Sequence, residues 1–262
     1  MEPKLPQRLL AEFVGALALV FIGAGAVITT QGGGSLVTVA LAHGLVIAVM
    51  VSAVGHVSGG HFNPAITIGA WVTQRIRLGD AAAYIGVQLA GAAAGAGLLR
   101  LAVPKDIWTP VKLGVPQAPE ILGTGQAVLI EAVLTFFLVW VVFATVMDPD
   151  GSFRKIAGLG IGFAIAMGIM FGGPFTGAAM NPARAFGPAL AGGSGFWTNH
   201  WIWWVGPVAG GIIAALLYDT VILRTRLRPP AEGTHAPAPA APEYGGPGEP
   251  AAPGGTTIGP EE

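Results

Sequence analysis

Two short stretches decide the fold of this chain: Ser58-Gly59-Gly60-His61-Phe62-Asn63-Pro64-Ala65 and Gly177-Ala178-Ala179-Met180-Asn181-Pro182-Ala183-Arg184. Each contains the triplet Asn-Pro-Ala and opens a short apolar run, about 63–73 and about 181–191. Asn is a preferred N-cap and Pro is favoured at the first helical position, so each triplet predicts a helix start. A ten-residue helix is roughly 15 Å long, about half of a bilayer core. Both runs are therefore expected to enter a membrane without crossing it.

The rest of the sequence has the composition of a membrane protein. Hydrophobic residues make up 53% and charged residues only 10%, with a mean hydropathy of +0.66. A soluble domain carries about 25% charged residues. Six apolar runs are long enough to span a bilayer, at about 8–28, 37–57, 82–102, 125–147, 156–173 and 201–222. We predict an all-α membrane protein with six spanning helices and two re-entrant half-helices.

Composition also excludes several classes of function. A net charge of −1 argues against a nucleic-acid partner, which needs a basic surface. The chain has no cysteine, so it has neither disulfides nor a cysteine metal site. His56 and His61 have no third metal ligand nearby, and no Ser-His-Asp set converges on the half-helices. We expect no metal, no cofactor and no enzymatic activity.

The two halves of the chain are related by an internal repeat. The triplets at Asn63-Pro64-Ala65 and Asn181-Pro182-Ala183 lie 118 positions apart, and Glu12 and Glu131 match at a similar offset. Three spans separate the triplets, so the second unit is inverted relative to the first. Inverted repeats in transport proteins place the functional site near the midplane. The half-helices are therefore expected to meet there by their N-termini.

The repeat gives the domain organisation. A channel domain is expected over 1–225, with one repeat at about 8–102 and the other at about 125–222. Residues 226–262 are rich in Pro, Ala, Gly and Glu and poor in large apolar residues, so this tail is expected to be disordered.

Lysine and arginine give the orientation. The loops on the side of both termini contain nine of these residues, and the other side contains Arg100, Lys105 and Lys112. The positive-inside rule places both termini in the cytoplasm. We expect a multi-pass protein of the plasma or inner membrane.

Glu12 and Glu131 are acidic residues inside predicted spans, where ionisable groups are costly. One interpretation is a proton relay. The other, which we favour, is that the two carboxylates accept hydrogen bonds from the backbone of the re-entrant loops and hold them in place.

The two quoted stretches closely resemble the aquaporin (major intrinsic protein) superfamily, and the resemblance extends over about 8–222. It implies an hourglass pore in each subunit of a homotetramer, with Asn63 and Asn181 donating to one water molecule. It also implies a selectivity filter of His43, Ile169, Ala178 and Arg184, and a place for His61 at the cytoplasmic vestibule. This filter is similar to that of plant tonoplast intrinsic proteins, some of which pass ammonia or urea.

The sequence thus predicts a passive water channel that excludes protons and ions. A broader channel that also passes ammonia, urea or glycerol is the alternative. An ion-coupled secondary transporter is a different class that also uses inverted repeats, but it needs an intramembrane coupling site. Only Glu12 and Glu131 are candidates for that site.

Overall fold

The computed structural model describes residues 3–31, 35–151 and 154–227, and within them the chain is helical without a strand. Six helical segments are long and apolar enough to cross a membrane. The six spanning helices are α1 (Leu5–Thr30), α2 (Leu36–Ser58), α4 (Leu78–Ala102), α6 (Thr124–Val142), α7 (Ala157–Thr176) and α9 (Ile202–Leu217). The predicted fold class is confirmed, and each predicted span corresponds to one of these helices.

Two of the spans are completed by wider turns that the sequence did not predict. Helix α6 continues into the π-helical turn η2 (Phe143–Met147), and α9 continues into η5 (Tyr218–Leu223). Arg75, just beyond the first half-helix, donates to buried Asp219 of η5 at 2.8 Å and to the Met147 carbonyl of η2 at 3.4 Å. These π-helical turns therefore anchor the C-terminal end of that half-helix.

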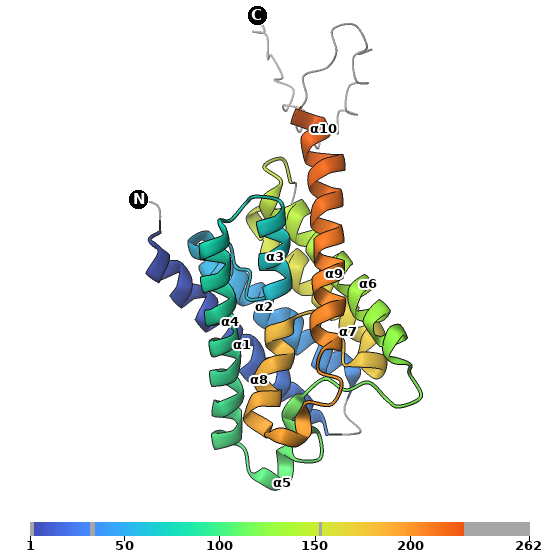
Figure 1. Ribbon diagram of the computed structural model, residues 1–262. Coiled ribbons are helices and arrows are strands. Elements are labelled where there is room, and N and C mark those ends of the chain that lie inside the picture. The colour runs from blue at the N-terminus through green and yellow to red at the C-terminus, as the bar shows by residue number, and fades with distance from the viewer. Residues whose placement is uncertain (1–2, 32–34, 152–153, 228–262) are drawn as a thin grey trace, which may run out of the picture. The chain divides into compact units, whose positions relative to one another are not determined.

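The two half-helices are α3 (Pro64–Val72) and α8 (Pro182–Gly192). Asn63 and Asn181 are their N-caps, and each side-chain Oδ1 accepts the backbone N–H two residues on, at 2.9 Å. Helix α3 lies toward the end of the bundle where α1 starts, and α8 lies toward the opposite end, near α5 (Figure 1). This is the inverted arrangement that the repeat predicts.

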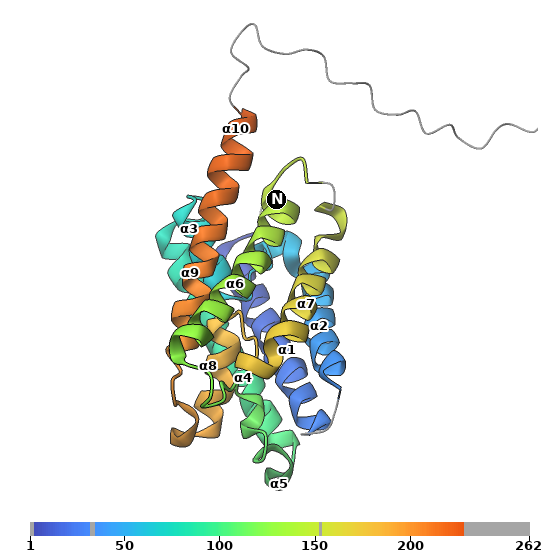
Figure 2. The ribbon, with the colours of Figure 1, turned by 90° about the vertical axis from the view of Figure 1, so that its right-hand side faces the viewer.

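Helix packing follows the same symmetry. In the first repeat α1 packs on α4 and α2, and in the second α6 packs on α9 and α7. Each half-helix crosses over to the other repeat, so that α8 packs on α4 and α3 packs on α9. Helices α2 and α7 lie side by side where the repeats meet (Figure 2). The crossing places the two Asn-Pro-Ala starts between the repeats.

Glycines at the helix crossings permit this close packing. A Cβ on Gly91 would collide with the Phe13 carbonyl, and one on its repeat mate Gly210 would collide with the Ala132 carbonyl. A Cβ on Gly44 would likewise lie only 2.5 Å from the Gly162 carbonyl oxygen. These glycines are used within one subunit, where small residues let helix backbones approach.

Short elements fill the connections: α5 (Lys105–Trp108), η1 (Lys112–Gly114), η3 (Arg154–Ile156), η4 (Ser194–Phe196) and α10 (Arg224–Leu227). Helix α10 extends two residues past the predicted domain boundary at 225, because the last span continues without a break through η5. The predicted disorder of the tail concerns residues 228–262, which lie outside the described residues.

Candidate permeation pathway

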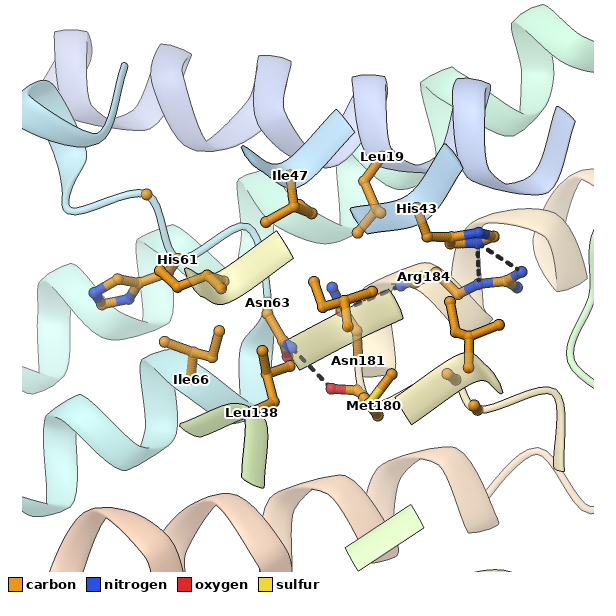
Figure 3. Close-up of a pocket in the computed structure, with 16 residues that line it drawn as sticks. Leu19, His43, Ile47, His61, Asn63, Ile66, Leu138, Met180, Asn181 and Arg184 are labelled. Atoms are coloured by element: carbon orange, nitrogen blue, oxygen red, sulfur yellow. Dashed lines mark hydrogen bonds between the residues drawn. The ribbon is translucent and has the colours of Figure 1, made fainter. Parts of the chain in front are cut away.

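The N-termini of α3 and α8 meet through their capping asparagines. Asn63 Nδ2 donates to the Met180 carbonyl at 2.8 Å, and Asn181 Nδ2 donates to the Phe62 carbonyl at 2.9 Å. Each amide therefore uses one hydrogen to tie its half-helix to the opposite re-entrant loop. A side-chain amide has two hydrogens, so each asparagine keeps one for a ligand between the half-helices. Figure 3 shows Asn63 and Asn181 near each other in the middle of the lumen.

These hydrogen bonds require an unusual backbone in the two loops. Phe62 and Met180 have φ angles of 47° and 50°, in the left-handed region that residues with a side chain rarely adopt. Such a conformation costs about 1–3 kcal/mol and persists only where surrounding contacts impose it. The carbonyls of Phe62 and Met180 are paired in this conformation, because each accepts from an asparagine of the other repeat.

Glu12 supplies the contacts that impose this conformation on the first loop. It is fully buried in α1 and accepts from the Ser58 hydroxyl at 2.7 Å and from the backbone N–H of His61 at 2.9 Å and of Phe62 at 2.7 Å. The Gln88 amide donates to it as well, at 2.8 Å. These contacts match the supporting role that we favour over a proton relay.

Glu131 makes the equivalent contacts in the second loop. It is fully buried in α6 and accepts from the Thr176 hydroxyl at 2.7 Å and from the backbone N–H of Ala179 at 2.9 Å and of Met180 at 2.8 Å. Trp203 Nε1 donates to the Thr176 carbonyl at 3.0 Å. In each repeat the buried glutamate thus accepts from one hydroxyl and from two backbone N–H groups of the re-entrant loop.

The four residues of the predicted filter all line the same lumen, and His43 and Arg184 are in contact at one end of it (Figure 3). Arg184 is 4% exposed, and its Nε and Nη2 lie 3.3 Å and 3.1 Å from His43 Nε2. His43 Nδ1 lies 2.8 Å from the Val39 carbonyl. Because a carbonyl only accepts, Nδ1 carries the proton, and Nε2 of this neutral ring accepts from Arg184. His43 thus draws the guanidinium toward α2.

Gly114 is a filter contact that the sequence did not reveal. Its carbonyl accepts from Arg184 Nη1 at 2.7 Å. Its φ of 73° follows two further left-handed residues, Lys112 and Leu113, and a Cβ there would meet Ala24 at 2.8 Å. Nothing in the loop sequence signals a carbonyl aimed at Arg184, because the contact depends on where the loop folds.

The lumen between the filter and His61 has an apolar wall, and of its aliphatic residues only Ile169 was predicted to line the pathway. It continues past the two asparagines, and His61 lies at the end opposite Arg184 (Figure 3). Its aliphatic side chains are Leu19, Ile47, Ile66, Leu138, Ile161, Ile165 and Ile169. The internal repeat could have located four of them, since Leu19 matches Leu138 at an offset of 119 and Ile47 matches Ile165 at an offset of 118.

The pathway is narrow in the middle and wide at the filter end. The volume of the lumen that the centre of a water molecule can occupy is only about 20 Å³. One water needs roughly 10–15 Å³ of such volume, so the lumen has room for little more than one water at a time. Beyond Arg184 and Ile169 it opens into a vestibule of about 440 Å³ bounded by α2, α7 and the loop at 110–117. In the described part of the chain, no three His, Asp or Glu side chains gather as metal ligands.

His200 lies away from this pathway, just before α9. Its ring is buried between Trp197 and Trp203, at centroid distances of 4.7 Å and 6.0 Å. Neither ring nitrogen has a hydrogen-bond partner within the residues described. Burial lowers the pKa of His200 below its ordinary value of 6.5. As the pH falls, His200 of the unfolded chain therefore binds a proton at a higher pH than His200 of the folded chain does.

We expect His200 to make the fold sensitive to acid. Its neutral form favours the folded state fully above about pH 6.5, and this contribution is lost as the pH falls toward the lower pKa of the folded state. The melting temperature of His200→Phe should therefore fall less between about pH 7.5 and about pH 5 than that of the wild type. His56→Phe, at an exposed position, is the matched control. Equal acid sensitivity of the wild type and His200→Phe would contradict this prediction.

Comparison with known proteins agrees with this geometry. Residues 2–218 match the family model described as Major intrinsic protein. The chain is 44% identical over 245 residues to "Aquaporin TIP4-4" of Zea mays, covering 89% of this chain and 90% of that protein. It is also 44% identical to "Probable aquaporin TIP3-2" of Arabidopsis thaliana, covering 90% and 91%. "Aquaporin-4" of Mus musculus is 40% identical over 80% of this chain and 66% of its own length.

A solved structure supports the fold alone. The aquaglyceroporin from Plasmodium falciparum superposes with a TM-score of 0.77 at 22% identity, covering 86% of this chain and all of that one.

The six spans, the inverted half-helices and the narrow lumen define an integral, multi-pass membrane channel. The chain belongs to the major intrinsic protein family. The family assignment confirms the prediction of a channel rather than an enzyme.

Proposed function

We propose that this protein is a passive water channel that excludes protons and ions. The observation that carries the proposal is the pair of half-helix N-termini whose asparagine amides each keep one hydrogen for the lumen. A water molecule between Asn63 and Asn181 accepts from both amides through its oxygen. Its own hydrogens then point away in opposite directions. A continuous chain of proton transfer is interrupted at that water.

Electrostatics supports the exclusion of cations. Each helix N-terminus carries about half a positive charge, and both half-helices direct that end at the same point of the lumen. Arg184 adds a full charge at the filter, held by Gly114 and His43. Selectivity in aquaporin-type pores is already understood to rest on these same elements, namely pore width, lining groups and half-helix dipoles.

Stopped-flow osmotic shrinkage of liposomes containing the purified protein tests this function. Water permeability should exceed that of empty liposomes, with no dependence on a sodium or proton gradient. Flux that requires such a gradient would favour the secondary transporter. Water permeability equal to that of empty liposomes would exclude the water channel.

A broader channel that also passes ammonia or urea is the second candidate. The observation in its favour is a filter in which the imidazole of His43 and the aliphatic Ile169 form two of the walls. The small free volume of the lumen favours water, while ammonia has a similar size. The same shrinkage assay with urea and glycerol, and a pH-jump assay with ammonia, distinguish the two candidates.

Replacing His43 tests how the filter is built. His43→Phe is expected to reduce ammonia or urea flux more than water flux, because phenylalanine is larger and leaves Arg184 Nε and Nη2 without their acceptor. The measurement is stopped-flow permeability for each solute, with His200→Phe as a buried control outside the pathway. A wild type that passes neither ammonia nor urea would exclude the broader channel.

We further propose that the protein resides in the plasma or inner membrane as a homotetramer with both termini in the cytoplasm. The bias of lysine and arginine supports the orientation. Large apolar side chains exposed on α7, among them Phe163, Met167 and Phe171, suit contact with lipid or a second subunit. Native mass spectrometry tests the homotetramer, and protease accessibility of the tail in sealed vesicles tests the orientation.

A further inference from the structure

The end of the lumen opposite the filter contains a buried polar network that belongs to the first repeat alone. Thr67 of α3 is fully buried, and its hydroxyl lies 3.0 Å from His61 Nδ1 and 3.1 Å from the Asn63 carbonyl. Gln88 of α4, also fully buried, donates through Nε2 to Thr67 Oγ1 at 2.9 Å and to Glu12 at 2.8 Å. The network therefore connects Glu12, which supports the re-entrant loop, to His61, whose side chain lines the lumen.

The orientation of the Gln88 amide is fixed by its neighbours. Its Oε1 is buried and has no hydrogen-bond partner in the described residues. Turning the amide over would place Oε1 against the Glu12 carboxylate oxygen, which accepts hydrogen bonds, and would remove a donor from Thr67. An unpaired buried oxygen is costly, but the alternative adds the loss of both donated bonds. Gln88 Nε2 therefore faces Thr67.

This orientation determines the hydrogen bond to His61. Thr67 Oγ1 accepts from Gln88 and directs its own hydrogen to the Asn63 carbonyl. A hydroxyl has one hydrogen and two lone pairs, so what remains toward His61 is an acceptor. His61 Nδ1 must then be the donor, and Nε2 carries a lone pair.

The second repeat has no equivalent network. His61 and Thr67 correspond to Ala179 and Ala185 at the offset of 118, and Gln88 corresponds to Pro207 at the offset of 119 that also relates Glu12 to Glu131. Glu131 nevertheless holds its loop with the same backbone contacts as Glu12. Support of the loop therefore does not require Gln88 and Thr67, and their conjunction with His61 calls for a separate role.

We propose that Thr67 and Gln88 are positioning residues that hold His61 as the Nδ1–H tautomer, so that Nε2 is a hydrogen-bond acceptor for permeating water at the end of the lumen opposite Arg184. This inference rests on the proposed water-channel function. Water that leaves the asparagine pair on this side points its hydrogens away from Asn63. An acceptor at Nε2 suits that orientation, whereas an Nε2–H group opposes it.

The tautomer is measured by ¹⁵N NMR on histidine-labelled protein in lipid, with the His61 signals assigned by their loss in His61→Gln. The wild type should show a protonated Nδ1 and an unprotonated Nε2. Thr67→Val keeps the shape of the side chain and removes its hydroxyl, and should shift the tautomer ratio about two- to tenfold, as expected for one neutral hydrogen bond. Thr67→Ser should restore the wild-type spectrum.

Water permeability per channel provides the functional measurement. Thr67→Val should lower it, and Thr67→Ser should recover it. Thr135→Val is the matched control, since Thr135 is also fully buried but, among the residues described, its hydroxyl bonds only to the Glu131 carbonyl of its own helix. A wild type with Nε2–H, or a Thr67→Val protein with an unchanged tautomer and unchanged permeability, would overturn the inference. The tautomer is read without any flux, so absence of wild-type water flux would count against the channel function separately.

Discussion

Glu131→Ala is expected to lower the free energy of unfolding by at least about 2 kcal/mol, because it takes the carboxylate acceptor from three buried donors, leaves two of them without any acceptor, and each such donor costs about 1–3 kcal/mol. The donors are the Thr176 hydroxyl and the backbone N–H groups of Ala179 and Met180. Met180 is also held in a left-handed conformation. Loss of the carboxylate should therefore release the loop, and with it the acceptor of Asn63 Nδ2. Unfolding in mixed micelles with increasing sodium dodecyl sulfate measures the change.

Two variants bracket this result. Glu120→Ala removes an exposed carboxylate from a loop and should change stability by no more than about 0.5 kcal/mol. Glu131→Gln keeps the shape and one acceptor, and should fall between Glu131→Ala and the wild type. If Glu131→Ala were as stable as Glu120→Ala, the carboxylate would not be what holds the loop.

Arg184→Val is expected to raise the proton permeability of protein-containing liposomes by at least about tenfold while water still passes. A unit charge about 4 Å from a cation contributes roughly 4 kcal/mol at an effective dielectric constant of 20, and 1.4 kcal/mol corresponds to about tenfold. Shortening the side chain also widens the lumen beside Ile169, so urea flux should rise. An entrapped pH-sensitive dye and osmotic shrinkage measure the proton and solute fluxes.

Lys112→Ala is the control for the charge at Arg184. Lys112 is exposed at the vestibule and donates to Gln117 at 2.7 Å. Its removal takes away a positive charge near the entrance and leaves the filter contacts in place. If the proton permeability of both Arg184→Val and Lys112→Ala equalled that of the wild type, the half-helices alone would account for the exclusion of protons.

The sequence predicted the architecture well because its signals are local and repeated. Hydrophobic length located the spans, and the two Asn-Pro-Ala triplets located the N-caps of α3 and α8. Glu12 and Glu131 stood out as acids at matching positions inside apolar runs, where a charge needs a partner. The hydrogen bonds to the re-entrant loops supply that partner.

Features that depend on contacts between distant segments could not be predicted. The Gly114 carbonyl reaches Arg184 only because a left-handed run turns the loop over the filter. The bond from each asparagine to the opposite loop depends on how the two repeats meet. Thr67 and Gln88 resemble ordinary helix residues in the sequence, and only their distances to His61 and Glu12 connect them to the lumen.

The central claim is that water passes between two half-helix N-termini that exclude protons. Parallel recordings on one preparation of liposomes, with osmotic shrinkage by light scattering and proton flux by an entrapped pH-sensitive dye, test it most directly. We expect fast shrinkage together with a pH gradient that decays no faster than in empty liposomes. Fast shrinkage accompanied by collapse of the pH gradient at a matching rate would contradict the claim.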